Sequence, residues 1–299
     1  MAVPSLTILV PTHNRPDVLK RVWPSWLLQQ GIAQIVVVND GSTVDYTSVL
    51  AELEAECAAN GIDLKIINVD MRRGAPAARN LGLSACTSEE IFTTDDDLVL
   101  APDLIERCRA QRPERLVPVI VGPRVIYLKD DETQARADVR SKEDQCAYFR
   151  PGDLTLVPWV DPGSVLRTPF VTALTLWPRQ LFDRGLRYCE HYGGNGFREE
   201  TDPQLQAQTL FGAEIYLTPA AKAFHLPPAI AYSHAGGQRR GGRLWFEYWV
   251  HRNNAAFLRR NSSIIRKTAG RSPFSCWLSL LMNRVVLKPI RTLARARGR

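Results

Sequence analysis

Three consecutive carboxylates, Asp95, Asp96 and Asp97, lie between two apolar runs in the stretch 92–100. Like charges this close raise one another's pKa values unless a cation or firm hydrogen bonds hold them ionised. A divalent ion such as Mn2+ or Mg2+, bound through one or two carboxylates and phosphate oxygens, would supply that cation. Asp also favours solvated turns and helix N-caps, so the three residues alone leave both explanations open.

A second acidic group, Glu199 and Glu200, follows the glycine-rich stretch 193–196. A carboxylate that follows flexible backbone at the start of a helix is well placed to act as a general base. Acids in a first helical turn also favour the helix dipole, so capping is the alternative. Further on, His225 would complete a metal shell of carboxylate and phosphate, although a lone histidine is more often packed or at the surface.

The elements that must position these residues alternate between strand and helix over the first hundred residues. The segment 34–40 is a continuous apolar run, as expected for a strand covered on both faces of its sheet. We predict an α/β fold with a Rossmann-like, mostly parallel sheet, flanking helices and right-handed crossovers. The predicted strands are 5–10, 34–40, 63–69 and 90–94, and the predicted helices are 15–30, 44–60 and 75–86.

Ligands of such sheets bind beyond the carboxyl ends of the strands. There Asp40 would hydrogen-bond a nucleobase or ribose, although N-D-G-S is also ordinary turn chemistry. Arg79, in a small-residue segment, would reach a nucleotide, and an ordinary surface arginine is the alternative. The polar or flexible groups predicted to meet at this rim are 12–15, 39–42, 71–74 and 95–97.

The middle of the chain is less regular. Strand-like runs occur at 117–128, 171–177 and 214–219, and a helix-like run occurs at 204–212. The segment 129–145 is a dense mixture of charges, which predicts a loop or a helix solvated on most faces.

The composition is that of an ordinary globular protein, with 299 residues, 45% hydrophobic and 23% charged. Six scattered cysteines lack metal or C-x-x-C spacing, and the N-terminus lacks a basic n-region, so we expect a cytoplasmic protein without a signal peptide. The net charge is +7, and no Asp or Glu follows Glu247. That basic end favours anionic partners such as phosphates, nucleic acid or a membrane surface.

The C-terminal region has two parts. The segment 243–261 is aromatic and basic, and we predict an amphipathic helix that packs on the body. The segment 273–287 is apolar and is followed by basic residues up to Arg299. Such a sequence suits an anionic membrane surface, and a docking helix for a homodimer or for the catalytic body is the alternative.

Six short motifs follow one another in an order that resembles the family 2 glycosyltransferases, which have the GT-A fold. The resemblance runs from about Leu6 to about His225 and continues weakly to Asn261. It implies a catalytic domain at 1–240, with a nucleotide-sugar-binding half at 1–100 and an acceptor-binding half at 101–240, and a helical extension at 241–299. The motifs are I-L-V-P-T-H-N-R (8–15), V-V-V-N-D-G-S (36–42), G-A-P-A-A-R-N-L-G-L (74–83), T-D-D-D-L (94–98), E-E-T-D (199–202) and P-A-A-K-A-F-H (219–225).

The resemblance implies a role for each matched position. Mn2+ or Mg2+ would be held by Asp96 or Asp97 of the DXD-type motif together with His225, and His234 replaces His225 if the alignment slips. The acceptor would lie near Gly194, Asn195 and Asp202. The implied nucleotide-sugar residues are Pro11, Thr12, Asn14, Arg15, Asp40, Gly74, Arg79, Asp95 and Asp96.

The implied reaction is an inverting single displacement. A carboxylate base deprotonates an acceptor hydroxyl, which attacks the sugar of a nucleoside-diphosphate sugar, with UDP or dTDP preferred. The family's E-D-x-D motif carries the base at its second position, which is Glu200 here, and the change from Asp to Glu leaves Glu199 as the alternative. The acceptor would be a glycan, a lipid-linked glycan or a small molecule.

Three other functions are alternatives to glycosyl transfer. A nucleotidyltransferase would carry a Gly-rich, Lys-bearing phosphate loop near the N-terminus, where this chain has P-T-H-N-R. A nucleic-acid-binding protein is not expected, because no nucleic-acid motif accompanies the basic end. A protein that binds nucleotide sugars without catalysis can be distinguished from an enzyme only by experiment.

Overall fold

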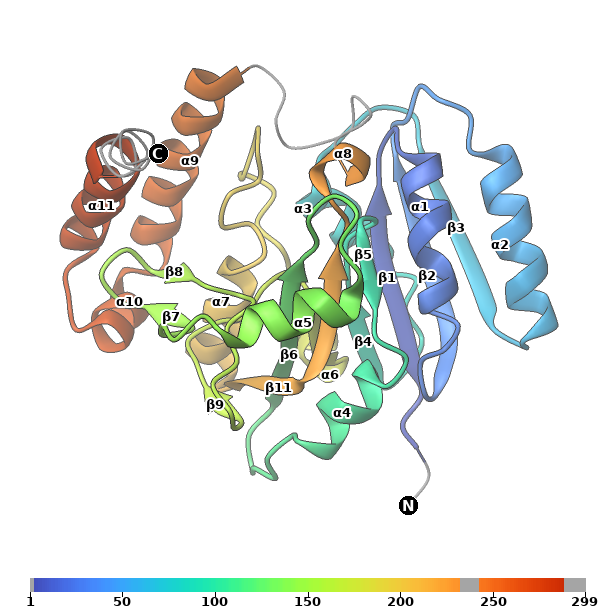
Figure 1. Cartoon of the computed structure of the whole chain (residues 1–299), viewed down its shortest axis with the longest axis horizontal. Helices are drawn as coiled ribbons and strands as arrows, with labels where there is room; N and C mark the ends of the chain where they lie inside the picture. Colours follow the sequence, from blue (N-terminus) through green and yellow to red (C-terminus); the bar gives the residue numbers. More distant parts are fainter. Residues whose placement is uncertain (1–2, 232–241, 288–299) are drawn as a thin grey trace.

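A curled nine-stranded sheet forms the centre of the computed structural model, which describes residues 3–231 and 242–287 (Figure 1). Its strand order is β3-β2-β1-β4-β10-β6-β11-β5, and β9 pairs with β11. Neighbours from β3 to β4 are parallel, as are β6 and β11, whereas β10, β5 and β9 are antiparallel to their partners. The strands are β1 (Leu6–Thr12), β2 (Ile32–Asp40), β3 (Asp63–Val69), β4 (Glu90–Thr93), β5 (Leu98–Leu100), β6 (Val119–Tyr127), β9 (Leu166–Arg167), β10 (Thr175–Pro178) and β11 (Glu214–His225), and β7 (Phe149–Arg150) and β8 (Thr155–Leu156) form a separate hairpin.

Helices cover both faces of the sheet, because the side chains of the central strands alternate between two apolar clusters. Leu6, Ile8 and Val10 of β1 face α1, α2 and α4, whereas Leu9 faces α3 and α6. The prediction of a mainly parallel α/β sheet flanked by helices is therefore confirmed. The helices are α1 (Pro16–Val22), α2 (Thr47–Ala59), α3 (Ala75–Leu83), α4 (Leu104–Ala110), α5 (Gln134–Lys142), α6 (Gln180–Asp183), α7 (Asp202–Phe211), α8 (Pro228–Ala231), α9 (Gly242–Arg260), α10 (Ser262–Ala269) and α11 (Pro273–Leu281), with a 3-10 turn η1 (Trp23–Ser25) and a π-helical turn η2 (Met282–Leu287).

One glycine allows α3 to lie close to the sheet. A Cβ atom at Gly82 would lie 2.2 Å from Cδ1 of Leu9 in β1. A larger residue would force either the buried Leu9 side chain or the helix to shift. This close packing matters for function, because α3 carries Arg79.

The predicted helix 15–30 is wrong in length. Helix α1 ends at Val22 and continues only as the short turn η1. Pro24 lies within that turn, where the missing N–H and the proline ring prevent a continuous α-helix.

Strands β5 and β11 were not predicted in their observed form. The expected strand 214–219 is the first half of β11, which continues to His225 after an irregularity between Thr218 and Lys222. The apolar run of β5 pairs antiparallel with the second half of β11. The three aspartates therefore lie in the turn between β4 and β5, which belong to distant positions in the sheet.

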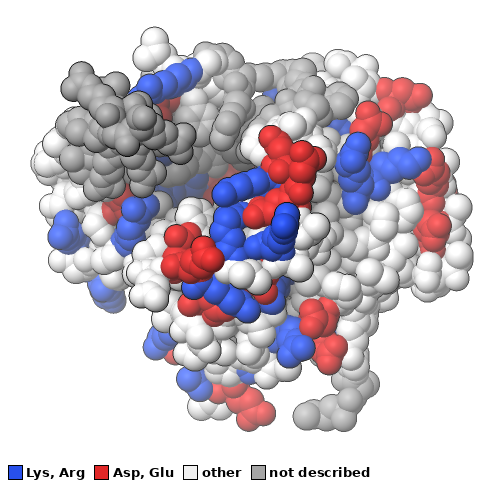
Figure 2. Space-filling model, in the orientation of Figure 1, with Lys and Arg blue, Asp and Glu red and all other residues white. Residues whose placement is uncertain are grey.

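The charged segment 129–145 contains helix α5, which confirms the helical alternative. Ion pairs link many of its charges, including Arg140 with Glu132 at 2.7 Å and Lys222 with Asp138 at 2.8 Å. Figure 2 shows acidic and basic side chains lying side by side across the middle of this face. A surface of mixed sign, with its charges paired, does not indicate a nucleic-acid interface.

The C-terminal helices pack on the body, as the predicted helical extension requires. Phe257, Ile265 and Cys276, from α9, α10 and α11, share one apolar cluster with Leu154 of the β7–β8 turn and Leu205 of α7. The domain boundary at residue 240 stays a prediction, because residues 232–241, which include His234, lie outside the described residues. Within the described ranges, no helix is both long and apolar enough to cross a membrane.

Candidate active site

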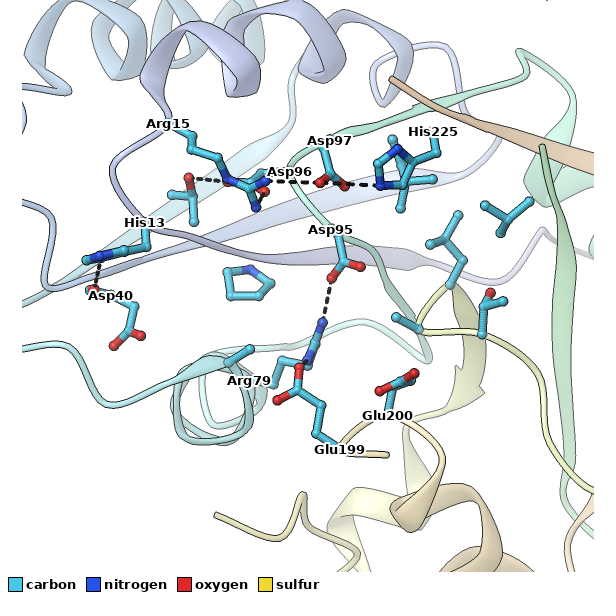
Figure 3. A pocket seen from close by; sticks show the side chains of 18 of the residues that line it. His13, Arg15, Asp40, Arg79, Asp95, Asp96, Asp97, Glu199, Glu200 and His225 are labelled. Atoms are coloured by element: carbon cyan, nitrogen blue, oxygen red, sulfur yellow. Dashed lines mark hydrogen bonds and ion pairs between the residues drawn. The ribbon is translucent and has the colours of Figure 1, made fainter. Parts of the chain in front are cut away.

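A cavity of about 300 Å³ opens where the carboxyl ends of β1, β2 and β4 meet. The predicted rim is therefore confirmed, because residues from all four predicted groups line this cavity. Figure 3 shows Arg15, Asp96, Asp97 and His225 in one row, with Arg79 below them between Asp95 and Glu199. The charged and titratable lining residues are His13, Arg15, Asp40, Arg72, Arg79, Asp95, Asp96, Asp97, Tyr127, Glu199, Glu200 and His225.

Backbone hydrogen bonds hold the aspartate turn at both ends. The amide of Thr94 donates to the carbonyl of Leu9 in β1 at 3.1 Å. The carbonyl of Asp97 accepts from the amide of Leu226, just after β11, at 2.9 Å. The turn is thereby fixed between two segments that come together only because the sheet curls.

Arg15 is the cation beside two of the aspartates. Its guanidinium contacts Asp96 and lies 3.0 Å from Oδ2 of Asp97. Asp96 also accepts from the hydroxyl of Thr12 at 2.6 Å. Burial raises the pKa of Asp96 to about 6, and the nearby Arg15 opposes that rise. A protein side chain thus supplies part of the positive charge that holds these aspartates ionised.

Arg79 links the two acidic groups. Its buried guanidinium lies 2.5 Å from Oδ1 of Asp95 and 3.0 Å from Oε1 of Glu199. It also lies over the ring of Tyr188, 5.5 Å from the ring centroid. Arg79 therefore brings a turn after β4 and a loop more than a hundred residues later to the same wall of the cavity.

The two glutamates differ in their surroundings. Burial raises the pKa of Glu199 to about 8, and its partner Arg79 opposes the rise. Burial also raises the pKa of Glu200, which lines the cavity. Among the described residues, no side chain is hydrogen-bonded to the Glu200 carboxylate. Glu200 is therefore the better placed of the two to accept a proton from a bound molecule.

Asp97 and His225 offer two donor atoms that fit one divalent cation. Nδ1 of His225 lies 2.7 Å from the carbonyl oxygen of Leu226. Because a carbonyl only accepts, Nδ1 donates there, and Nε2 faces Oδ2 of Asp97 at 3.6 Å. Two ligand atoms about 2.1 Å from an octahedral ion lie about 3 Å apart or more, so this separation is compatible with Mn2+ or Mg2+.

The remaining ligands of such an ion would not come from a larger acidic cluster. Within residues 3–231 and 242–287, no group of three or more His, Cys, Asp or Glu side chains is arranged to hold a metal. Two protein donors, completed by diphosphate oxygens, are the usual arrangement for these hard cations at phosphate sites. Arg15 contacts both Asp96 and Asp97, but Asp96 is also bound by Thr12 and Asp97 is the one that faces His225, so the geometry favours Asp97 as the carboxylate donor.

Asp40 holds the loop that follows β3. Its two carboxylate oxygens accept from the amides of Arg73 at 2.7 Å and Gly74 at 2.8 Å. Gly74 has a φ of 94°, a conformation that favours glycine. Asn14 has a similar bracing role, because its side-chain oxygen accepts from the amide of Thr43 at 2.7 Å. Recognition of a nucleobase by these residues stays a prediction.

Comparison with known proteins agrees with this geometry. Residues 7–155 match the sequence profile described as Glycosyl transferase family 2. The chain belongs to this family. The family assignment made from the motif order is therefore confirmed.

Two curated relatives resemble part of this family 2 protein. The succinoglycan biosynthesis protein ExoO of Rhizobium meliloti (strain 1021) is 32% identical over 105 residues, which are 35% of this chain and 29% of that protein. The pre-mycofactocin glycosyltransferase of Mycobacterium tuberculosis (strain CDC 1551 / Oshkosh) is 28% identical over 127 residues, which are 42% of this chain and 25% of that protein. The chain thus matches less than a third of the length of either relative.

Solved structures resemble the family 2 protein over nearly its whole length. The mannosyltransferase PcManGT from Pyrobaculum calidifontis, in complex with GDP-Man and Mn2+, has a TM-score of 0.58 and 18% identity, and the match covers 95% of this chain and 71% of that one. S. aureus TarS 1-349 in complex with UDP-GlcNAc has a TM-score of 0.54 and 12% identity, covering 94% and 91%. At such low identity these likenesses show the shared GT-A fold.

The predicted acceptor residues do not line the cavity, and their role in acceptor binding stays a prediction. Gly194, Asn195 and Asp202 lie against the C-terminal helices, outside the lining of the cavity. A Cβ atom at Gly194 would lie 2.2 Å from the ring of Trp249, and Asn195 donates to the carbonyl of Phe246 at 3.2 Å. Asp202 is fully buried and is bonded to Tyr192, Arg260 and Asn261. The motif order could not reveal these contacts, because α9 and α10 come much later in the chain.

The sequence analysis did not single out Tyr127, which lines the cavity, or Tyr46, which contacts two lining residues from behind. The hydroxyl of Tyr46 lies 2.8 Å from the hydroxyl of Thr12 and accepts from the amide of Arg15 at 2.7 Å. Tyr127 lies at the end of β6, with its ring centroid 5.0 Å from that of His225. The rule that ligands meet strand ends would have found Tyr127. No sequence signal pointed to Tyr46.

The raised pKa of Glu199 predicts a pH-dependent stability. The folded state binds the Glu199 proton more tightly than the unfolded chain, so the stability that it contributes is complete below pH 4.5 and is lost as the pH rises through about 8. We expect the free energy of unfolding to fall between about pH 4.5 and 8, and Glu199→Gln to flatten that fall. Urea denaturation across this range measures it. Glu190→Gln, at an exposed position, is the control and should keep the wild-type slope.

Proposed function

We propose that this protein is an inverting, metal-dependent glycosyltransferase that moves a sugar from a nucleoside-diphosphate sugar to an acceptor hydroxyl. The observation that carries the proposal is the convergence of Asp97, His225 and Glu200 on one cavity of a family 2 protein. Asp97 and His225 would hold Mn2+ or Mg2+, and that ion would neutralise charge on the leaving diphosphate.

Glu200 is the proposed base. It takes the proton from the acceptor hydroxyl while the hydroxyl oxygen attacks the anomeric carbon. The bond between that carbon and the phosphate oxygen breaks on the opposite face, and its electron pair leaves with the nucleoside diphosphate. One displacement inverts the anomeric centre and needs a single catalytic carboxylate, unlike the paired acids of hydrolases.

The donor is proposed to carry UDP or dTDP. Pro11, Thr12 and Asp40, at the ends of β1 and β2, would surround the base and ribose, and Arg79 with Asp95 would face the ribose or sugar. The solved structures that resemble this chain include complexes with GDP-Man and with UDP-GlcNAc, so the fold accommodates more than one base. The acceptor, a glycan, a lipid-linked glycan or a small molecule, would lie against Tyr127 and the segment 172–174.

Ligand binding tests the donor site. We expect UDP-sugars with MnCl2 to raise the melting temperature, since a ligand at about 100 times its Kd stabilises by ~2.7 kcal/mol. Asp97→Asn should remove the dependence on Mn2+, because it deletes one of the two protein donors. The matched control is Asp103→Asn, a change at a surface ion pair. If no nucleotide sugar stabilises the protein, with or without Mn2+, the proposal fails.

Turnover distinguishes the proposed base from its neighbour. We expect Glu200→Gln to lower the release of nucleoside diphosphate by about 10²- to 10⁴-fold, the range for loss of a general base, with donor binding retained. Glu199→Gln should keep more activity, since Glu199 is already paired with Arg79. Release of pyrophosphate instead would indicate a nucleotidyltransferase, and donor binding without release would indicate a sugar-nucleotide binder.

We also propose that the C-terminal helices bind the inner face of an anionic membrane from the cytoplasm. Helix α11 and turn η2 bury Cys276 and Leu280 but leave an apolar stripe exposed, with Phe274 at 69%. Exposed Arg266, Lys267 and Arg271 lie nearby in sequence, and no acidic residue follows Glu247. An apolar stripe beside basic residues suits anionic lipid. The stripe consists of Phe274, Leu278, Met282, Val285 and Val286.

Co-sedimentation with vesicles of phosphatidylglycerol and phosphatidylcholine tests the membrane proposal. We expect the wild-type protein to bind these vesicles better than pure phosphatidylcholine, and Phe274→Ser with Leu278→Ser to weaken binding about tenfold or more, as apolar area is lost. Val139→Ser changes an exposed apolar residue of α5 and is the control. Equal sedimentation of all three proteins would contradict the proposal. If the wild-type protein is a homodimer and the double variant is a monomer, the stripe serves self-association instead.

A further inference from the structure

Helix α9 binds the loop that leads into the two glutamates. The ring of Trp249 packs on Gly193 and Gly194, so close that a Cβ atom at either would lie within 3 Å of it. The side-chain Nδ2 of Asn253 donates to the backbone carbonyl of Gly193 at 2.8 Å. This loop therefore has little freedom to move unless α9 moves with it.

Arg198, at the end of this loop, is a buried cation bonded only to neutral acceptors among the described residues. Nε donates to the side-chain oxygen of Asn254 in α9 at 3.1 Å. Nη1 and Nη2 donate to the carbonyls of Leu154 at 2.6 Å and Asp153 at 3.0 Å, in the β7–β8 turn. The guanidinium thus joins three segments that are far apart in sequence, and it lies next to Glu199 and Glu200 in the chain.

Aromatic rings enclose the same guanidinium. Its carbon lies 4.7 Å from the ring centroid of Phe197, 5.0 Å from that of Phe257 and 5.9 Å from that of Phe170. Such rings attract a cation. An arginine guanidinium is less strongly hydrated than a lysine ammonium, so it loses less hydration energy when it packs against them. Burial lowers the pKa of Arg198 to about 10, which leaves it charged at neutral pH.

The backbone at Arg198 is held in a conformation that non-glycine residues rarely adopt. Its φ is 77°, and that of its partner Leu154 is 55°. Such conformations persist where the surrounding contacts determine them, and they gather at functional sites. Immediately after this residue, Glu199 donates its amide to the carbonyl of Gly196 at 2.9 Å, and the chain turns toward the cavity.

We propose that Arg198 is a positioning residue that fixes Glu200 at the cavity wall, and that α9 takes part in catalysis by holding Arg198 through Asn254. The role given to Glu200 rests on the proposed function. Arg198 also favours the ionised base, because its charge acts on Glu200 together with Arg79 of α3. The acids Asp95 and Glu199 act in the opposite direction.

Hydrogen–deuterium exchange tests whether Arg198 and Asn254 hold the loop 193–201 in place, and it needs no assay of activity. In the full-length protein, Arg198→Met should raise amide exchange in residues 193–201 by about tenfold or more, and Asn254→Ala should give a smaller rise in the same segment. The control is Arg109→Met, which removes a mostly buried arginine of α4 that pairs with Glu90 at 2.8 Å and donates to the carbonyls of Pro4 and Gln30, and it should leave exchange at 193–201 unchanged. Unchanged exchange at 193–201 in both variants would overturn the proposal, even if the proposed function holds.

Kinetics test the link to the base, using the nucleotide sugar that gives the largest thermal shift. Arg198→Met and, to a lesser degree, Asn254→Ala should lower kcat, by up to about 100-fold, with little change in KM for the donor. Loss of the positive charge raises the pKa of Glu200, so the acid limb of the pH–rate profile should move to higher pH in Arg198→Met. Arg198→Lys keeps the charge and should restore the position of that limb.

An unmoved acid limb together with a normal kcat in Arg198→Met would overturn the proposal. A wild-type protein without turnover would instead refute the proposed function, and the exchange result would stand.

Discussion

The bridge that Arg79 makes between Asp95 and Glu199 is the interaction on which the site depends. One guanidinium pairs with two acids from distant parts of the chain, and the buried Arg79 and Glu199 would each be costly to bury alone. The bridge also sets the distance between the aspartate turn and the glutamate loop. Gly82 favours it, because a side chain there would clash with Leu9 of β1 where α3 carries Arg79 under the turn.

Around this bridge, each of the three aspartates has different partners and a different role. Asp96 pairs with Arg15 and Thr12, and Asp95 pairs with Arg79. Asp97 faces His225 as well as Arg15, which suits a shared cation. A run of three like charges is therefore divided among an arginine on either side and a histidine. Their environments, and not their order in the chain, separate their roles.

The motif order predicted the residues that line the cavity better than the contacts that hold those residues in place. Asp40, Arg79, Asp97, Glu200 and His225 all line the cavity, because strand ends in a parallel sheet meet at one rim. The predicted acceptor residues Gly194 and Asp202 instead pack against α9 and the residue that follows it, away from the cavity lining. Strand β5 was also missed, because three apolar residues become a strand only when β11 lies beside them.

By itself, the sequence determined the strand–helix alternation, the rim, the family and the identity of the charged groups. These follow from local periodicity, from turn residues and from short motifs that are contiguous in the chain. Only the tertiary structure decided which acid pairs with which cation, that Arg15 and Arg79 share the charge of the aspartates, and that α9 supports the loop before Glu200. The physical reason is that pairing energy depends on distance and burial, and both arise only when remote segments pack together.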